Sequence, residues 1–335
     1  MLIPYGDQVK ILITGANGFL GHWMARRLRD EGHETFALLR NLANIDELKQ
    51  LGIYPVLGDI TNRDSVFSAC KNMDGVFHLA GLVAYTRRDR TSMIQVNYHG
   101  TKNIVDACIE LKVPRLLHVS SVAAVGASFS PNVILNETSP FNLRHLHLGY
   151  FDTKHAAEMY VRRATRFSKL SAVIVNPSTI YGAGDAKKGS RGTQLKVARG
   201  KFLFYTGGGA NVVAVEDVID AMWAAWQKGA SGERYILCGE NILIKDLFTK
   251  IAKAAGVNPP KILMPNSALK MLGIAGDLLE KCGQKAPLSS ETAWISQLYH
   301  WFSNEKAKKE LGFKTRSADI AIENSVRWCK DNHLI

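Results

Sequence analysis

The stretch "KILITGANGFLGHW", residues 10–23, decides how the rest of the chain is interpreted. It begins with an apolar run of the length of a buried β-strand and continues with helical spacing from Phe19. Gly15, Gly18 and Gly21 lie between and just inside these segments. Glycine permits positive φ in a tight turn and lets backbone N–H groups approach a pyrophosphate. At a strand–turn–helix junction, this spacing favours a dinucleotide site over a turn that binds nothing.

Outward from this stretch, short apolar runs alternate with amphipathic segments. We expect strands at 10–15, 34–40, 55–60, 75–81, 115–121 and 171–177, and helices at 19–32, 64–73, 97–112 and about 150–167. Strands that alternate with helices predict a parallel sheet covered on both faces. One more strand and helix of this sheet are expected at 211–229, and 233–239 leads into a smaller domain. A helix at 303–313 is expected to have Ser303 as its N-cap and to stop at Gly312.

Composition is that of a globular protein. Of the 335 residues, 46% are hydrophobic and 21% charged, and no apolar run approaches the ~20 residues of a membrane span. The N-terminus lacks a secretory pattern, so we expect a soluble, cytoplasmic protein. The five cysteines are scattered without CxxC spacing. This pattern predicts reduced thiols, with neither a disulfide framework nor a metal site.

Positive charge is concentrated in the second half of the chain. The net charge of +12 divides into +2 for residues 1–150 and +10 for residues 151–335. Such an excess suits an anionic ligand or surface, or serves only solubility. The basic residues are dispersed and accompany no nucleic-acid module, so no nucleic-acid partner is expected.

The type of dinucleotide is indicated by the end of the second strand. NAD-selective sites place Asp or Glu there to bond the ribose 2′-hydroxyl. Here the strand ends in Arg40, whose guanidinium suits a 2′-phosphate. NADP(H) is therefore favoured, with NAD(H) as the alternative. Asp59 and Ile60, after the third strand, are expected beside the adenine ring.

Tyr150 and Lys154 are spaced one helical turn apart in "GYFDTK", so their side chains share one helix face. A phenol is protonated at neutral pH, and a nearby cation lowers its pKa. The pair predicts a proton donor or acceptor with a tuned pKa. A bare Tyr-x-x-x-Lys also occurs as simple helix packing, so the surrounding motifs must decide.

Seven motifs occur in a fixed order: "TGANGFLG", "GDI", "HLAG", "NYHGT", "HVSS", "GYFDTK" and "NPSTIYG". As a set they resemble the extended short-chain dehydrogenase/reductases, in the NAD-dependent epimerase/dehydratase family, over nearly the whole chain. "VSSVAAVG", "GERYILCGEN" and "NEKAKKELGF" are most similar to the dihydroflavonol-reductase-like branch, which neighbours the 3β-hydroxysteroid dehydrogenases. The resemblance implies an α/β fold, with a Rossmann-type doubly wound parallel sheet and a smaller α/β substrate domain. We assign 1–176 and 211–232 to the first domain, and 177–210 and 233–335 to the second.

The resemblance also implies roles for particular residues. Tyr150 is expected to be the general acid/base, Lys154 to bond the nicotinamide ribose and lower the pKa of the tyrosine, and Ser121 to bond the substrate oxygen. Further cofactor contacts are expected from Gly15, Asn17, Gly18, Phe19, Leu20, Gly21, Arg40, Asp59, Ile60, Leu79, Ala80, Gly81, Asn176, Pro177 and Ser178.

Four other polar residues are expected outside the catalytic set. Asn97 should form structural hydrogen bonds near the site, and His78 should pack beneath the cofactor. His145 and His147 lie in a loop without further ligands, so we expect no metal site.

Three functions follow from these motifs. The first is an NADP(H)-dependent reductase/dehydrogenase acting on a ketone or secondary alcohol. The second is an epimerase or dehydratase of a nucleotide-linked sugar that retains NAD. One residue argues against it, because Asn176 occupies the position where many such epimerases have Arg. The third, a non-catalytic dinucleotide-binding regulator, would not need Ser121, Tyr150 and Lys154 together. The substrate is expected to be a small molecule, anionic or hydrophobic, and a homodimer stays open.

Overall fold

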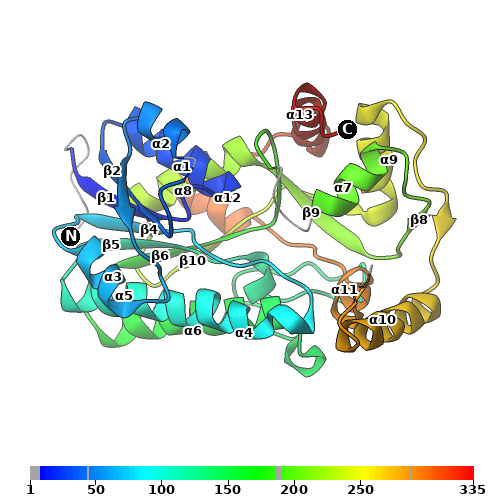
Figure 1. The fold of residues 1–335 in the computed structure, drawn as a ribbon, viewed down its shortest axis with the longest axis horizontal. Coiled ribbons are helices and arrows are strands. Elements are labelled where there is room, and N and C mark those ends of the chain that lie inside the picture. Colours follow the sequence, from blue (N-terminus) through cyan, green and yellow to red (C-terminus); the bar gives the residue numbers. More distant parts are fainter. Residues whose placement is uncertain (1–7, 44, 186–190, 285, 287) are drawn as a thin grey trace.

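The computed structural model describes residues 8–43, 45–185, 191–284, 286 and 288–335. A seven-stranded parallel sheet with the order β10-β6-β5-β4-β1-β2-β3 forms one half of the molecule (Figure 1). Its strands are β1 (Lys10–Thr14), β2 (Glu34–Leu39), β3 (Tyr54–Leu57), β4 (Gly75–His78), β5 (Arg115–Val119), β6 (Ala172–Pro177) and β10 (Arg234–Leu237). The order and the parallel pairing confirm the expected Rossmann-type α/β fold.

Helices cover both faces of this sheet, as Figure 1 shows. On one face lie α1 (Phe19–Asp30), α2 (Asp46–Gln50), α8 (Val215–Lys228) and α12 (Glu305–Leu311). On the other lie α3 (Arg63–Cys70), α5 (Gly100–Glu110) and α6 (Gly149–Phe167). Each layer has its own apolar core, because a sheet covered on both faces buries the side chains of both. The central strands β4, β5 and β6 are accordingly buried along their whole length.

The direction of the chain reverses between β1 and β4. From β1 the chain proceeds outward to β2 and β3, and then returns to β4 on the other side of β1. In such sheets the loops after the two central strands diverge and leave a crevice at their carboxyl ends. The glycine loop follows β1, and residues 79–81 follow β4, so both expected cofactor segments lie at this crevice.

The second half of the molecule is built around two small sheets. One has the order β11-β9-β7 and the other pairs β12 with β8. Their strands are β7 (Thr179–Tyr181), β8 (Phe204–Tyr205), β9 (Gly209–Ala214), β11 (Glu240–Leu243) and β12 (Ile262–Leu263). The helices of this half are α7 (Arg191–Ala198), α9 (Ile244–Ala255), α10 (Asn266–Lys281), α11 (Ser290–Ile295) and α13 (Ala318–Asp331). Figure 1 shows these elements at the end of the molecule away from β1–β3.

Two expectations about the sheets are wrong. The strand within 211–229 is β9, which belongs to the three-stranded sheet, although α8 after it does pack on the main sheet. The seventh strand of the main sheet is instead β10, which pairs in parallel with β6. The polypeptide thus crosses between the two halves again at 233–239, inside the range assigned to the substrate domain.

The helix at 303–313 also begins differently from the prediction. Asn304 occupies the N-cap position of α12, and its side-chain amide donates to the Cys238 carbonyl. The Ser303 hydroxyl instead accepts from the Glu305 N–H two residues on, at 3.3 Å. Gly312 ends the helix with φ of +70°, as expected for a left-handed cap.

Candidate active site

The loop after β1 leaves too little room for a side chain at its three glycines, Gly15, Gly18 and Gly21. Gly15 has φ of +75°, and a Cβ there would lie 2.9 Å from the Ala80 nitrogen. A Cβ on Gly21 would lie 1.9 Å from the Gly15 carbonyl oxygen, and one on Gly18 would lie 3.2 Å from it. The N-terminus of α1 therefore sits directly against the loop, and a helix N-terminus in this position favours an anion.

A cavity of about 620 Å³ opens beside this loop. It is lined by the expected residues Gly15, Asn17, Gly18, Phe19, Leu20, Gly21, Arg40, Asp59, Ile60, Leu79, Ala80 and Gly81. The sequence did not point to the rest of the wall, which comes from Leu38, Leu39, Gly58, Thr61, Leu82, Thr91, Ser92, Gln95 and Val96. Thr91, Ser92, Gln95 and Val96 lie in the helical turns before α5, where the sequence has no phosphate-binding pattern.

Arg40 and Asp59 differ in how they present their charge to this cavity. Arg40 is exposed at the end of β2, where its guanidinium can reach a ligand. The Asp59 carboxylate accepts two hydrogen bonds from Thr61, from the backbone N–H at 2.8 Å and from the hydroxyl at 2.9 Å. The Asp59 carboxylate is thus bonded within its own loop, whereas the Arg40 guanidinium can bind an anionic group of a ligand.

Tyr150, Lys154 and Ser121 are brought together from two elements. The first two lie one turn apart at the start of α6, and Ser121 follows β5. The Ser121 hydroxyl forms a hydrogen bond with the Tyr150 phenol, and the Lys154 ammonium donates to the Val119 carbonyl at 2.9 Å. All three line a second cavity of about 270 Å³, which shares Phe19, Leu20, Leu79 and Gly81 with the first. The glycine loop and the tyrosine therefore border neighbouring cavities that share part of their wall.

The protonation of Tyr150 differs from the expectation. Burial raises the pKa of Tyr150, and the Ser121 hydrogen bond only partly opposes this. Lys154, expected to lower this pKa, is not among the causes of the shift, and its ammonium donates to the Val119 carbonyl. The phenol is therefore held in its protonated form, as a proton donor requires.

Asn97 ties the catalytic helix to the loop after β4. It lies in a π-helical segment, Ile94–His99, between α4 (Arg90–Met93) and α5. Its side-chain oxygen accepts from the Leu82 N–H at 2.7 Å, and its amide donates to the Leu82 carbonyl and to the Thr153 hydroxyl. This is the structural role expected for Asn97. The buried amide thus joins the π-helical segment to the loop after β4 and to α6.

His78 is buried at the end of β4 and bridges its neighbours. Its Nδ1 lies 2.8 Å from the Thr14 hydroxyl and its Nε2 lies 3.0 Å from the Thr101 hydroxyl. Burial, with a smaller effect from Lys154, lowers the pKa of His78 to about 3. His78 is therefore neutral at pH 7 and structural.

This histidine predicts a loss of stability in acid. The unfolded pKa is about 6.5, so between that value and 3 the folded state binds fewer protons than the unfolded state. The free energy of unfolding should therefore fall as the pH is lowered through this window, by about 4–5 kcal/mol in total from His78. Urea unfolding at a series of pH values measures this slope. His78→Gln should flatten it, and equal slopes in wild type and His78→Gln would refute the assignment.

A buried ionic network lies directly behind the catalytic serine. Glu158 stands one turn after Lys154 on the same face of α6, and its carboxylate accepts from Ser120, from Asn176 and from Arg234. The side chains of Glu158 and Arg234 are 1% and 8% exposed. The sequence signal for Glu158 is its i+4 spacing from Lys154, which extends the face of Tyr150 and Lys154 by one helical turn.

Asn176 belongs to this network and does not line either cavity. It is fully buried, and its amide donates to the Ser121 carbonyl at 2.9 Å as well as to Glu158. A cofactor contact from Asn176 stays a prediction, whereas Pro177 and Ser178 do line the second cavity. Asn176 instead anchors the backbone that carries Ser121.

The rest of the catalytic cavity is mainly apolar and aromatic. Val83, Tyr85, Val122, Phe151, Ile180 and Ile295 line it. Tyr85 meets the Tyr150 ring edge-on at 5.9 Å between centroids. His300 donates from Nε2 to the Ile295 carbonyl, and burial lowers its pKa, so it is neutral. No local sequence pattern identifies Tyr85 or His300, because they reach the site from loops more than 200 residues apart.

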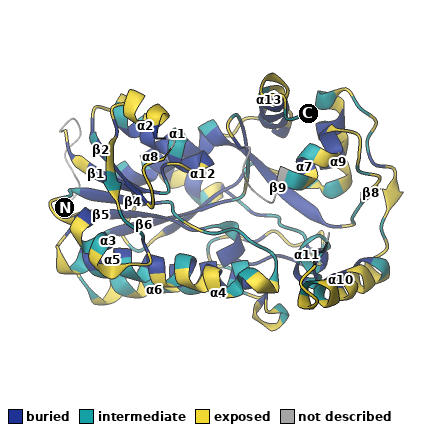
Figure 2. Ribbon diagram, in the orientation of Figure 1, coloured by how far each residue is buried: buried dark blue, intermediate teal, exposed yellow. Residues whose placement is uncertain are grey.

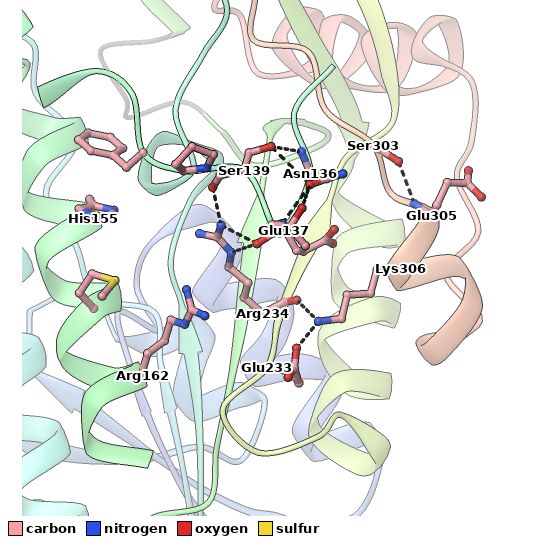
Figure 3. Close-up of a pocket in the computed structure, with 14 residues that line it drawn as sticks. Asn136, Glu137, Ser139, His155, Arg162, Glu233, Arg234, Ser303, Glu305 and Lys306 are labelled. Carbon is pink, nitrogen blue, oxygen red and sulfur yellow. Dashed lines mark hydrogen bonds and ion pairs between the residues drawn. The ribbon is translucent and has the colours of Figure 1, made fainter. Parts of the chain in front are cut away.

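A separate cavity of about 650 Å³ lies on the other side of the Arg234 network (Figure 3). Its cations are largely engaged with the protein. The Arg234 guanidinium donates to the carbonyls of Glu137 and Ser139, and the Lys306 ammonium pairs with Glu233 and bonds the Arg234 carbonyl. These contacts hold the backbone at Glu137 and Ser139 against β10, and Arg162 also lines the cavity.

No group of metal-ligating side chains is found among the described residues. His145 and His147 are exposed on the loop before α6. The five cysteines, all within the described part of the chain, form no disulfide, and four of them are buried. None of the helices in the described part of the chain is long and apolar enough to cross a membrane.

Comparison with known proteins agrees with this geometry. The sequence model of the "NAD dependent epimerase/dehydratase family" matches residues 11–238. A Synechocystis protein with the provisional name dihydroflavonol 4-reductase is 29% identical over 329 residues, covering 96% of this chain and 95% of its own. The crystal structure of gox2253 aligns with a TM-score of 0.86 at 33% identity, over 98% of this chain and all of the other. That of PA4631, a nucleoside-diphosphate-sugar epimerase from Pseudomonas aeruginosa, aligns with a TM-score of 0.79 at 25% identity, with the same coverage.

Proposed function

Because the chain belongs to the NAD dependent epimerase/dehydratase family, we propose that it is an NADP(H)-dependent reductase/dehydrogenase acting on a ketone or secondary alcohol. One observation carries this proposal. Ser121, Tyr150 and Lys154 line a cavity that shares Phe19, Leu20, Leu79 and Gly81 with the cavity of the glycine loop. A binding regulator would not need a buried, hydrogen-bonded phenol at that junction.

The residues of the first cavity fit a dinucleotide. The loop that excludes any Cβ leaves backbone N–H groups for a pyrophosphate. Arg40 would bond a ribose 2′-phosphate, and Asp59 and Ile60 would border the adenine. Lys154 would bond the nicotinamide ribose. The bound nicotinamide would supply or accept the hydride.

Tyr150 performs the proton transfer in this proposal. Its burial keeps the phenol protonated, so in the reducing direction it can donate to the oxygen of the substrate. The Ser121 hydroxyl, already bonded to the phenol, would polarise the same oxygen. Glu158 and Asn176 would act one layer behind, by holding the backbone around Ser120 and Ser121 in place.

The lining of the catalytic cavity favours an apolar, uncharged substrate. Among the described lining residues the charged groups are Lys154, assigned to the cofactor, and Asp185. A carboxylate or diphosphate in this cavity would lose its hydration and gain no further cation from that part of the wall. We therefore prefer a hydrophobic ketone to the anionic substrates that the net charge had left open.

A nucleotide-sugar epimerase is the second candidate. It is favoured by the likeness to PA4631, named as such an epimerase. Against it, Asn176 replaces the Arg of many such epimerases and is buried behind the site. An epimerase must also keep its cofactor through a cycle, whereas a reductase must exchange it.

The cofactor preference is tested at Arg40. We expect NADP(H) to bind more tightly than NAD(H), because a bidentate guanidinium–phosphate contact contributes about 1.5–3 kcal/mol. Arg40→Ala should weaken NADP(H) binding roughly 10- to 100-fold and should leave NAD(H) binding nearly unchanged. Calorimetric titration of both cofactors measures this, with Arg26→Ala, an exposed arginine on α1 outside the cavity, as the control. Equal or tighter NAD(H) binding by the wild type would rule out the preference.

A further inference from the structure

Helix α10 packs on the protein through its smallest residues. Leu269, Gly273 and Gly276 are its buried positions. A Cβ on Gly276 would lie 1.8 Å from the Leu288 carbonyl oxygen, and one on Gly273 would lie 2.9 Å from the Ser290 Cα. The helix backbone is therefore pressed against the start of α11 and the segment before it, with no room for larger side chains there.

The large apolar residues of α10 are on the opposite side. Met271, Leu272, Ile274, Leu278 and Leu279 are 72%, 50%, 58%, 57% and 40% exposed. At 100° per residue they form, with Ala268 and Ala275, one continuous stripe that faces away from Gly273 and Gly276. We call this stripe the outer face of α10. A helix on the surface of a globular protein normally has the reverse arrangement, so the outer face indicates a partner.

Figure 2 shows α10 exposed along most of its length, at the far end of the molecule from β1. The strand that leads into it adds two exposed apolar residues, Ile262 and Leu263. With 16 residues, α10 is shorter than the ~20 that a membrane span needs. Its shape is that of a helix that lies in a membrane surface.

The charges around the outer face are positive. Lys270 and Lys281 are exposed on its border. Neither acid of α10 is exposed: Asp277 is turned inward, where it pairs with Arg87 at 3.5 Å and accepts from the Ser290 N–H, and Glu280 is half-buried. An apolar face bordered by cations complements an anionic lipid surface.

We propose that the outer face of α10 binds the surface of an anionic lipid bilayer. A second copy of the chain fits less well, because a two-fold contact would bring the lysines of two identical faces together. Helix α11, on which α10 rests, also supplies Ile295 to the catalytic cavity. Insofar as the proposed function holds, membrane binding would bring an enzyme for an apolar ketone to the phase that dissolves its substrate.

Vesicle flotation of the full chain tests this proposal without any need for turnover, so its outcome is independent of the proposed reaction. The wild type should float with vesicles of phosphatidylcholine and phosphatidylglycerol, and less with phosphatidylcholine alone. The triple variant Met271→Gln, Ile274→Gln, Leu278→Gln should bind the anionic vesicles at least 10-fold more weakly. Lys270→Gln with Lys281→Gln should reduce the preference for anionic lipid.

A matched control changes exposed apolar residues elsewhere. Leu57→Gln with Phe167→Gln, at positions 63% and 75% exposed, should float like the wild type. The changed side chains contribute little to the core, so thermal unfolding should be similar in all these proteins. Absence of flotation by the wild type, or equal flotation by the triple variant, would overturn the proposal. Sedimentation that shows a dimer abolished by the triple variant, without vesicle binding, would overturn it in favour of a second copy.

Discussion

Tyr150→Phe should lower kcat by about 10²- to 10⁴-fold, the usual contribution of a positioned general acid. The substitution keeps the ring and removes only the hydroxyl that the Ser121 hydrogen bond orients. The packing of the ring against Tyr85 and Phe151 should survive, because those contacts are made by its carbon atoms. Dinucleotide affinity should change little, since the phenol is not needed at the glycine loop.

Steady-state kinetics and cofactor titration separate these effects. Tyr160→Phe is the matched control, because Tyr160 lies on the same helix and donates its hydroxyl to Asp106, away from the cavity. It should retain near-normal kcat. Lys154→Ala should weaken both turnover and cofactor binding, because Lys154 is assigned to the ribose as well as to the site. A Tyr150→Phe enzyme with near-normal kcat on its true substrate would show that the proposed mechanism is wrong.

The second large effect is a loss of stability, which we expect from Arg234→Met. Removing the guanidinium leaves the Glu158 carboxylate buried without its cation, and the carbonyls of Glu137 and Ser139 lose their donor. Breaking a buried ion pair in this way costs about 3–5 kcal/mol. The urea midpoint should shift accordingly, and kcat should also fall because Glu158 helps to hold Ser120 and Asn176.

An exposed ion pair supplies the comparison. Arg27 pairs with Asp220 at 2.6 Å, but the two side chains are 29% and 62% exposed. Arg27→Met should therefore cost about 1 kcal/mol or less. The double variant Glu158→Leu, Arg234→Met should recover part of the loss, because no buried charge remains unpaired. A cost for Arg234→Met no greater than that for Arg27→Met would contradict the importance of the network.

The sequence was most informative where a local pattern has a single physical cause. Gly15, Gly18 and Gly21 are required because any Cβ would collide with the turn, and the motif predicted both the turn and the cavity wall around it. The Tyr150–Lys154 spacing likewise brought two side chains to one face of α6. The alternation of strands and helices was sufficient for the parallel, two-sided sheet.

The sequence was least informative where the packing neighbours of a segment are determined by the whole fold. The apolar runs of β9 and β10 look alike, and their assignment to different sheets depends on which neighbours they meet. Asn176 ends a strand beside the site, but the burial of Glu158 and Arg234 turns its amide away from the cavity. The aromatic lining of the catalytic cavity is gathered from distant loops, so no local sequence pattern reveals the apolar character of this cavity.

Net hydride transfer with release of the cofactor is tested by measuring which dinucleotide the purified protein retains and whether it consumes NADPH. Freshly purified protein is denatured, and the supernatant is assayed for nicotinamide dinucleotide; the native protein is then mixed with NADPH and a panel of hydrophobic ketones, β-keto acids and UDP-sugars. We predict little or no retained dinucleotide, and a loss of reduced-nicotinamide absorbance with a hydrophobic ketone that Tyr150→Phe abolishes. Stoichiometric retained NAD, with interconversion of UDP-sugars and no net absorbance change, would contradict the claim and identify an epimerase.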